Sequence, residues 1–236
     1  MPPLSIIPVA GIGEIRPGDA LGPLIVDAAA AQSSPLARGD CVVVTQKIVS
    51  KAEDRLVALD HGDLTARAKV IASETVRVLR RRGDLVITET RHGFICANAG
   101  VDLSNVDAGN AALLPVDSDH SAHRIRNSVR ALADVEVGVI ISDTFGRPWR
   151  NGLTDVAIGV AGIAAVVDLR GNTDDRGQAL RVTEVALADE IAAAAELVMG
   201  KASGIPVAIV RGLESSWFRD GSVRELIRPA AEDLFR

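Results

Sequence analysis

The segment whose residues most clearly suggest chemistry is residues 140 to 155, IISDTFGRPWRNGLTD. An apolar run leads directly into Asp143 and Thr144, whose carboxylate and hydroxyl are the hard oxygen donors that Mg²⁺ and Mn²⁺ prefer. Arg147 and Arg150 follow, and guanidinium groups bind carboxylates and phosphates through paired hydrogen bonds. The pattern indicates a metal-dependent site for an anionic substrate. The alternative is an ordinary strand-ending turn with solvated charges.

Two further segments carry polar residues of the same kind. Asp102 lies in NAGVDLSN, residues 98 to 105, and could share a metal pair with Asp143 if the fold brings the two together. The segment TQKIVSK, residues 45 to 51, follows an apolar run and contains two lysines, which act as point charges near phosphate. Spacing along the chain does not show that these segments meet, and solvated surface positions are the alternative for each.

His120 and His123 lie three residues apart beside Asp117 and Asp119, a spacing that some metal sites use. They fall at the expected beginning of a helix, where polar residues cap the free backbone N–H groups. We therefore interpret these polar residues as part of a helix cap rather than as metal ligands.

Several common catalytic and nucleotide-binding motifs do not occur in the sequence. It contains no GxxxxGK[ST], no GxGxxG, no HExxH and no GxSxG. The P-loop and Rossmann folds, the zinc proteases and the α/β-hydrolases are therefore not favoured.

Composition indicates a globular protein that handles small molecules. The chain has 236 residues, 47% of them hydrophobic, and a core that must be aliphatic because it has four Phe, two Trp and no Tyr. The net charge of −5 argues against nucleic acid as a partner. Cys41 and Cys96 are predicted to be small buried side chains. We find no signal peptide and no membrane-spanning run, so a cytoplasmic location is expected.

The elements that must position these residues can be read from the hydrophobic pattern. Strands are predicted at residues 5–10, 41–45, 85–88, 94–97, 137–142 and 206–210. Helices are predicted at residues 22–31, 63–82, 119–134, 182–199 and 222–234. Residues 156–167 leave strand and helix both open. The irregular interleaving predicts an α+β fold with a mixed sheet, built as one domain of residues 1–236 or as two intertwined subdomains.

The order of the segments resembles one family over almost the whole chain, from Ile6 to Phe235. The series begins with PVAGIGEIRPGD, VVVTQKIVSKAEDR and TETRHGFICANAGVDLSN. It continues with LLPVDSD, ISDTFGRPWRNGLTDVAIGVAG, TEVALADEIAAAAELVMGK and PVAIVRG. This sequence resembles the coenzyme F420-0:L-glutamate ligases, including the ligase half of the bifunctional mycobacterial-type enzyme. The DTFGRPWRNGLTDVAIG block is the most specific part of the resemblance.

The resemblance implies a two-part α+β fold and a homodimer with its site at or near the interface. It implies GTP as co-substrate and two divalent cations, Mg²⁺ or Mn²⁺, with K⁺ as a further candidate. The implied metal ligands are Asp102, Asp143 and Thr144. The implied nucleotide contacts are Ile12, Gly13, Glu14, Ile15, Gln46, Lys51, Asn105 and Lys201. Gln46 departs from the Ser that some relatives have. Arg147 and Arg150 are our own candidates for binding anionic substrate groups.

The implied reaction joins L-glutamate to F420-0. GTP would phosphorylate the terminal carboxylate of F420-0, and the amine of L-glutamate would attack the acyl phosphate, with γ-linked glutamates added later. A different acceptor for the same ligase chemistry, and a nucleotide-binding sensor without turnover, stay open as alternatives. Bifunctional relatives continue into a nitroreductase-like domain, whereas this sequence stops at Arg236, as expected either of a stand-alone ligase or of a piece of a bifunctional enzyme.

Overall fold

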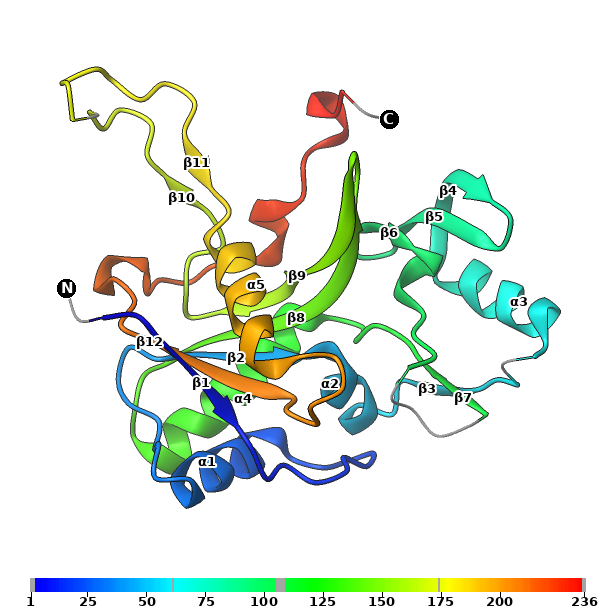
Figure 1. Cartoon of the computed structure of the whole chain (residues 1–236), viewed down its shortest axis with the longest axis horizontal. Helices are drawn as coiled ribbons and strands as arrows, with labels where there is room; N and C mark the ends of the chain where they lie inside the picture. The colour runs from blue at the N-terminus through cyan, green and yellow to red at the C-terminus, as the bar shows by residue number, and fades with distance from the viewer. Residues whose placement is uncertain (1–2, 61, 105–108, 174, 235–236) are drawn as a thin grey trace.

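The computed structural model describes residues 3–60, 62–104, 109–173 and 175–234. Its centre is a five-stranded sheet with the strand order β1-β12-β2-β8-β9 (Figure 1). These strands are β1 (Ser5–Val9), β12 (Val207–Arg211), β2 (Cys41–Thr45), β8 (Gly138–Arg147) and β9 (Arg150–Ala161). β2 and β8 run parallel and the other neighbours run antiparallel, so the predicted α+β fold with a mixed sheet is confirmed.

The parallel pair at the centre of the sheet sets the position of the polar segments. β2 and the first half of β8 are continuous apolar runs because both of their faces are covered. The register pairs Cys41 with Gly138 and Thr45 with Ser142. The residues that follow Thr45 and Ser142 therefore emerge at the same edge of the sheet.

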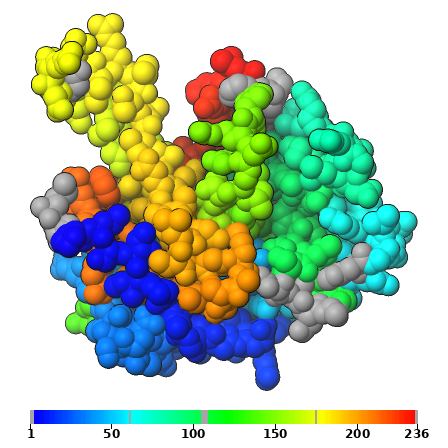
Figure 2. Space-filling view, viewed as in Figure 1, coloured from blue at the N-terminus to red at the C-terminus, as the bar shows by residue number. Residues whose placement is uncertain are grey.

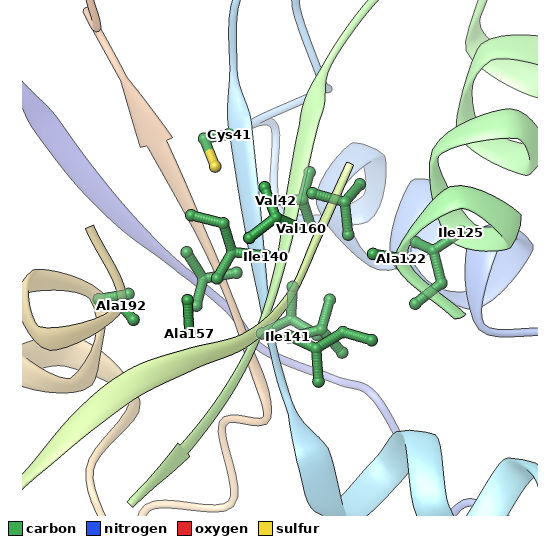
Figure 3. Packing of buried hydrophobic residues seen from close by; sticks show 14 of the residues in the cluster. Cys41, Val42, Ala122, Ile125, Ile140, Ile141, Ala157, Val160 and Ala192 are labelled. Atoms are coloured by element: carbon green, nitrogen blue, oxygen red, sulfur yellow. The ribbon is translucent and has the colours of Figure 1, made fainter. Parts of the chain in front are cut away.

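Helices cover both faces of the sheet. The helices α1 (Leu21–Ala31) and α4 (Ser118–Ala133) pack against each other, and α4 lies against β8 and β9. On the other face, α5 (Leu187–Met199) packs on β9, β1 and β12. Figure 3 shows Ala192 of α5 on one side of the strands and Ala122 and Ile125 of α4 on the other. Both free cysteines are buried, as predicted, and no described helix is long and apolar enough to cross a membrane.

A second group of elements lies at the side of the central sheet, in cyan and green in Figure 1. It contains a two-stranded and a three-stranded antiparallel sheet. Its elements are α2 (Gln46–Ala52), β3 (Leu56–Ala58), α3 (Leu64–Glu74), β4 (Thr75–Arg82), β5 (Leu85–Thr90), β6 (Ile95–Ala97), the 3-10 turn Asn98–Gly100 and β7 (Asn110–Ala112).

The predicted helix at residues 63–82 is wrong in its second half. The helix α3 ends at Glu74, and β4 begins at Thr75 and pairs with β5. Thr75, Val76 and Val78 are β-branched, and such side chains fit a strand better than a helix when a partner strand is available. The arginines at the end of β4 therefore belong to a hairpin rather than to a helix terminus.

Two other predicted boundaries are corrected by the structure. α5 begins at Leu187 rather than at residue 182, because β11 (Glu184–Val185) pairs with β10 (Val167–Asp168). The predicted helix at residues 222–234 is replaced by two 3-10 helices, Val223–Leu226 and Ala230–Glu232. Pro229 separates the two, since it has no N–H to continue a helix and restricts the residue before it.

Residues 156–167, which the pattern left open, are strand as far as Ala161. β8 and β9 form a long hairpin whose tip stands out from the body of the protein (Figure 2). The arm that carries β10 and β11, yellow in the same view, projects further (Figure 2).

Candidate active site

A cleft of about 570 Å³ opens at the sheet edge where β2 and β8 deliver their polar residues. It is lined by the loop after β1, the end of β2 with α2, the middle of β8, and the end of α5 with the segment that follows it. The lining includes the predicted residues Ile12, Gly13, Glu14, Ile15, Lys51, Asp143, Thr144 and Lys201. Residues from distant parts of the sequence thus meet at one cleft, which spacing along the chain did not show.

The loop after β1 is fixed at the cleft by one buried side chain and one ion pair. Ile15 is buried in the main core, which holds this end of the loop against the body of the protein. The Glu14 carboxylate is paired with the ammonium of Lys51 on α2. Only 12% of the Lys51 side chain is exposed, so its charge is directed into the cleft rather than into bulk water.

The helix α2 places a second lysine, Lys47, at the cleft, whereas the side chain of Gln46 on the same helix is buried. Lys47 Nζ lies 3.0 Å from Oδ2 of Asp102 and donates to Ser104 Oγ at 2.8 Å. The side chain of Gln46 is fully buried instead, where its Nε2 donates to Ser50 Oγ and to the Leu113 carbonyl. Gln46 does not line the cleft, so a nucleotide contact through this side chain finds no support.

Asp102 is held beside the cleft by backbone pairing. It forms an isolated antiparallel bridge with Ala112, with N–H to carbonyl distances of 2.9 and 2.8 Å. Oδ1 of Asp102 accepts hydrogen bonds from both the N–H and the hydroxyl of Ser104. Burial alone would raise the pKa of the Asp102 carboxyl, but the bonds from Ser104 and the Lys47 ammonium outweigh it and lower the pKa.

Asp143 has the most perturbed carboxyl group of the cleft. Burial raises the pKa of this carboxyl to about 7, although a hydrogen bond from the Thr144 N–H acts to lower the pKa. The carboxylates of Asp102 and Asp155 add to this rise through charge repulsion. Three carboxylates thus lie close enough to influence one another, a concentration of negative charge that a divalent cation would relieve.

Asp155 is a site residue that the sequence analysis did not identify. It lies opposite Thr144 in the β8–β9 register, and only 3% of its side chain is exposed. Its carboxylate accepts hydrogen bonds from Ser142 Oγ at 3.1 Å and Thr144 Oγ1 at 2.6 Å. The signal in the sequence is one acid directly before the apolar run of β9, and it becomes informative only with the antiparallel register of the hairpin.

Lys201, on the segment after α5, completes this cluster. Its ammonium donates to Thr144 Oγ1, lies 2.9 Å from Asp155 Oδ1 and lies 3.1 Å from Glu196 Oε1. Burial opposes its charged form, but the bonds to Asp155 and Glu196 outweigh burial and raise its pKa.

The described residues contain no group of three or more His, Cys, Asp or Glu side chains arranged to hold a metal ion. Mg²⁺ does not need such a cage, because it is commonly bound through one or two carboxylates, waters and substrate phosphates. Asp102 and Asp143 fit that pattern, since they are neighbouring hard oxygen donors. His120 and His123 lie instead on a separate cavity beside α4, where Asp117 caps the helix by accepting from the His120 N–H.

Two further predicted residues, both on the β8–β9 hairpin, do not line the cleft. Arg147 and Arg150 are exposed at the tip of the β8–β9 hairpin, where Arg147 Nη2 donates to the Asn151 carbonyl at 2.9 Å. Neither arginine lines the cleft, so the structure does not join them to the acidic cluster. Asn105 lies outside the described residues.

The fold places acidic and basic side chains at one cleft, and comparison with known proteins gives the family. The sequence profile of the family described as F420-0:gamma-glutamyl ligase matches residues 11–212. The chain is 42% identical to the coenzyme F420:L-glutamate ligase of Methanothermobacter thermautotrophicus, with 99% of each chain covered. It is 43% identical to the protein of the same name from Methanopyrus kandleri, covering 100% of this chain and 99% of the relative.

A third protein of that name, from Methanocaldococcus jannaschii, is 42% identical with 86% of each chain covered. The chain therefore belongs to the F420-0:gamma-glutamyl ligase family.

Proposed function

We propose that this protein joins L-glutamate to coenzyme F420-0, with GTP as phosphoryl donor and a divalent metal ion that neutralises charge at the transferred phosphoryl group. The observation that carries the proposal is the meeting of Asp143, Asp102 and three lysines at one cleft. Two relatives that match this chain along nearly its full length are coenzyme F420:L-glutamate ligases, and they support the choice of acceptor and amino acid.

The phosphates of GTP would lie between the loop after β1 and α2. Lys51 and Lys47 supply positive charge from α2, at positions one helical turn apart. Lysine ammonium groups bind phosphate as point charges and neutralise the charge that develops during transfer. Lys201, on the segment after α5, lines the same cleft.

Asp102 and Asp143 would hold a divalent cation through their carboxylate oxygens. When bound, that ion supplies charge neutralisation at the transferred phosphoryl group. The chain's own contribution is to fix the carboxylates: the Asp102–Ala112 bridge and the Thr144 N–H hold their positions. Ordered ligands of this kind do not have to reorganise during the reaction.

The chemistry needs no protein nucleophile. A carboxylate oxygen of F420-0 forms a bond to the γ-phosphorus as the bond to GDP breaks. The amine of L-glutamate then bonds to the acyl carbon, phosphate leaves with its electron pair, and the ammonium proton is lost.

The exposed hairpin tip supports a dimeric arrangement in which Arg147 and Arg150 meet anionic groups of a substrate. Trp149 is 80% exposed and Leu153 is 67% exposed on the same tip. Large exposed apolar side chains beside arginine are typical of interaction surfaces. We therefore place the tip against a second copy of the chain, near that copy's cleft.

A mass-spectrometric assay tests the function directly. The protein is incubated with F420-0, L-glutamate and Mn²⁺, with GTP in one series and ATP in the other. A product heavier by one or more glutamyl units in the GTP series is expected, and omission of metal should remove it. Turnover of GTP with another carboxylate acceptor would indicate a ligase of different specificity, and tight GTP binding without turnover would indicate a sensor.

A further inference from the structure

A second cavity, of about 690 Å³, opens around the beginning of α4. Its walls come from residues 91–94 after β5, residues 116–120, Ile158 of β9 and the C-terminal segment from Val223 onward, red in Figure 1. We call this space the α4 cavity. It is larger than the cleft beside Asp143, which has about 570 Å³, and its size is in the range that holds small organic ligands.

The α4 cavity borders the strand that carries Asp143. Phe94 lines the cavity, and its ring meets the ring of Phe145 edge-on, with centroids 6.2 Å apart. Phe145 and Asp143 are on the same face of β8, because side chains alternate along a strand. Burial raises the pKa of the Cys96 thiol to about 12, and the Asp143 carboxylate adds to this rise, so the chain just after Phe94 lies near Asp143.

Aromatic and aliphatic side chains form one wall of the α4 cavity. The rings of His92 and Phe94 are stacked, with centroids 5.6 Å apart and an interplanar angle of 16°. Gly93 lies between them with φ 90°, and its N–H donates to the Thr90 carbonyl, so a tight turn places both rings together. Ile158 adds aliphatic surface. Flat heteroaromatic ligands pack against walls of this kind.

Two polar atoms buried in this wall have no hydrogen-bond partner among the described residues. One is Nδ1 of His92, whose Nε2 lies 2.8 Å from the Pro115 carbonyl oxygen. Because a carbonyl oxygen only accepts, Nε2 carries the proton and Nδ1 of the neutral ring is an acceptor. The other is Oγ of Ser118, a residue that is 4% exposed. Buried polar groups are nearly always bonded, so these two atoms match a ligand that offers an N–H beside a carbonyl.

The charges of the α4 cavity favour an anionic ligand. The carboxylate of Asp119 is already satisfied inside the protein, since it accepts hydrogen bonds from the N–H groups of Val160 and Val223. Asp117 likewise caps α4. In contrast, the exposed guanidinium of Arg224 has no ion pair within the part of the chain that the structure describes. Guanidinium groups of this kind bind phosphate and carboxylate.

We infer that the α4 cavity binds the deazaflavin ring of F420-0, which rests on the proposed function. The ring lies against the His92 and Phe94 pair, with its alternating carbonyl and N–H edge at Ser118 Oγ and His92 Nδ1. Arg224 supplies positive charge to the anionic molecule, whose phosphodiester links the ring to the carboxylate that reacts. The position of the cavity beside β8 places the acceptor on the side of the strand that carries Asp143.

Binding of F420-0 in the presence of GDP and Mn²⁺, without L-glutamate, tests the inference. Equilibrium dialysis with the absorbance of the deazaflavin as signal gives Kd for the full chain. Ser118→Ala should raise this Kd by roughly fivefold to tenfold, the effect of one lost hydrogen bond, while the KM for GTP stays unchanged. The melting temperature should not fall, because the Ser118 hydroxyl has no partner among the described residues to lose. Ser215→Ala, outside the α4 cavity, is the matched control.

Arg224→Gln should raise the same Kd by roughly fivefold, and Arg38→Gln, at an exposed arginine outside the α4 cavity, is its control. An unchanged Kd for Ser118→Ala would overturn the inference and leave the proposed function intact. If Ser118→Ala does not fold, Arg224→Gln decides, because its side chain is exposed. A wild type without measurable F420-0 binding would also overturn the inference, and the mass-spectrometric assay then shows whether the proposed function fails with it.

Discussion

Thr144 and Asp155 face each other across the β8–β9 hairpin, and the Thr144 hydroxyl donates a 2.6 Å hydrogen bond to Oδ1 of the buried Asp155 carboxylate. The two residues lie eleven positions apart in the sequence. Their pairing ties the cleft wall to the hairpin register, so a change in that register would separate the acidic cluster from the cleft.

Asp155→Ala should lower the free energy of unfolding by about 1–3 kcal/mol, because the buried Ser142 hydroxyl and the half-buried Thr144 hydroxyl lose their acceptor. Lys201 is left out of this estimate, since it is half exposed and water can replace its partner. Urea denaturation measures the change. Asp175→Ala, at an exposed position, serves as the control and should stay within about 0.5 kcal/mol of wild type. Equal stability of the two variants would contradict the buried role of Asp155.

Asp143→Asn should reduce turnover by at least about 100-fold, because it removes a charged oxygen ligand of the proposed cation. The fold should stay intact, since the substitution keeps the size of the side chain and relieves repulsion with Asp102 and Asp155. Steady-state rates measure the turnover, and circular dichroism checks that the variant is folded. A folded variant with near wild-type turnover would remove Asp143 from the metal site.

Lys51→Ala should raise the KM for GTP by roughly tenfold or more while changing kcat less, because the lost contact is made mainly to the bound nucleotide. Lys69→Ala is the matched control, because Lys69 is exposed on α3 and does not line the cleft. Initial rates at varied GTP concentration separate the two constants. An unchanged KM for GTP would exclude Lys51 from the nucleotide site.

Mn²⁺ binding should weaken as the pH falls through about 7. Burial raises the pKa of the Asp143 carboxyl to about 7, so below that pH a proton occupies the ligand and must leave before a cation binds. Because protons and Mn²⁺ compete for the same carboxylate, the affinity for Mn²⁺ should drop by about tenfold per pH unit below the pKa. Titration calorimetry at pH 6 and pH 8 in buffers of different ionisation enthalpy also counts the released proton. Equal affinity at both values would mean that Asp143 binds no cation.

Arg147→Ala and Arg150→Ala should each raise the KM for F420-0 by about tenfold without changing the melting temperature. Both side chains are exposed at the hairpin tip, so they contribute little to folding. A steady-state assay at varied F420-0 gives the constants, and light scattering gives the oligomeric state. If both variants keep the affinity for F420-0 and the dimer, the tip does not have its proposed role.

The sequence by itself predicted much of the framework, because local patterns determine it. The apolar runs of β2 and β8 predicted two buried strands, and the polar residues after each run were singled out as candidates for chemistry. The mixed α+β class and the family were also recognised correctly. These features depend on residue types that are close together in the chain, or on long blocks of sequence.

Only the tertiary structure decided which side chains meet. The register of β8 and β9 brought Asp155 to Thr144, and α5 and Gly200 brought Lys201 to both. Packing turned Gln46 into the interior, although its neighbours in the sequence line the cleft. Strand pairing likewise converted residues 75–82 from predicted helix to β4. Contacts between residues that are far apart in the chain depend on register and packing, which local periodicity does not encode.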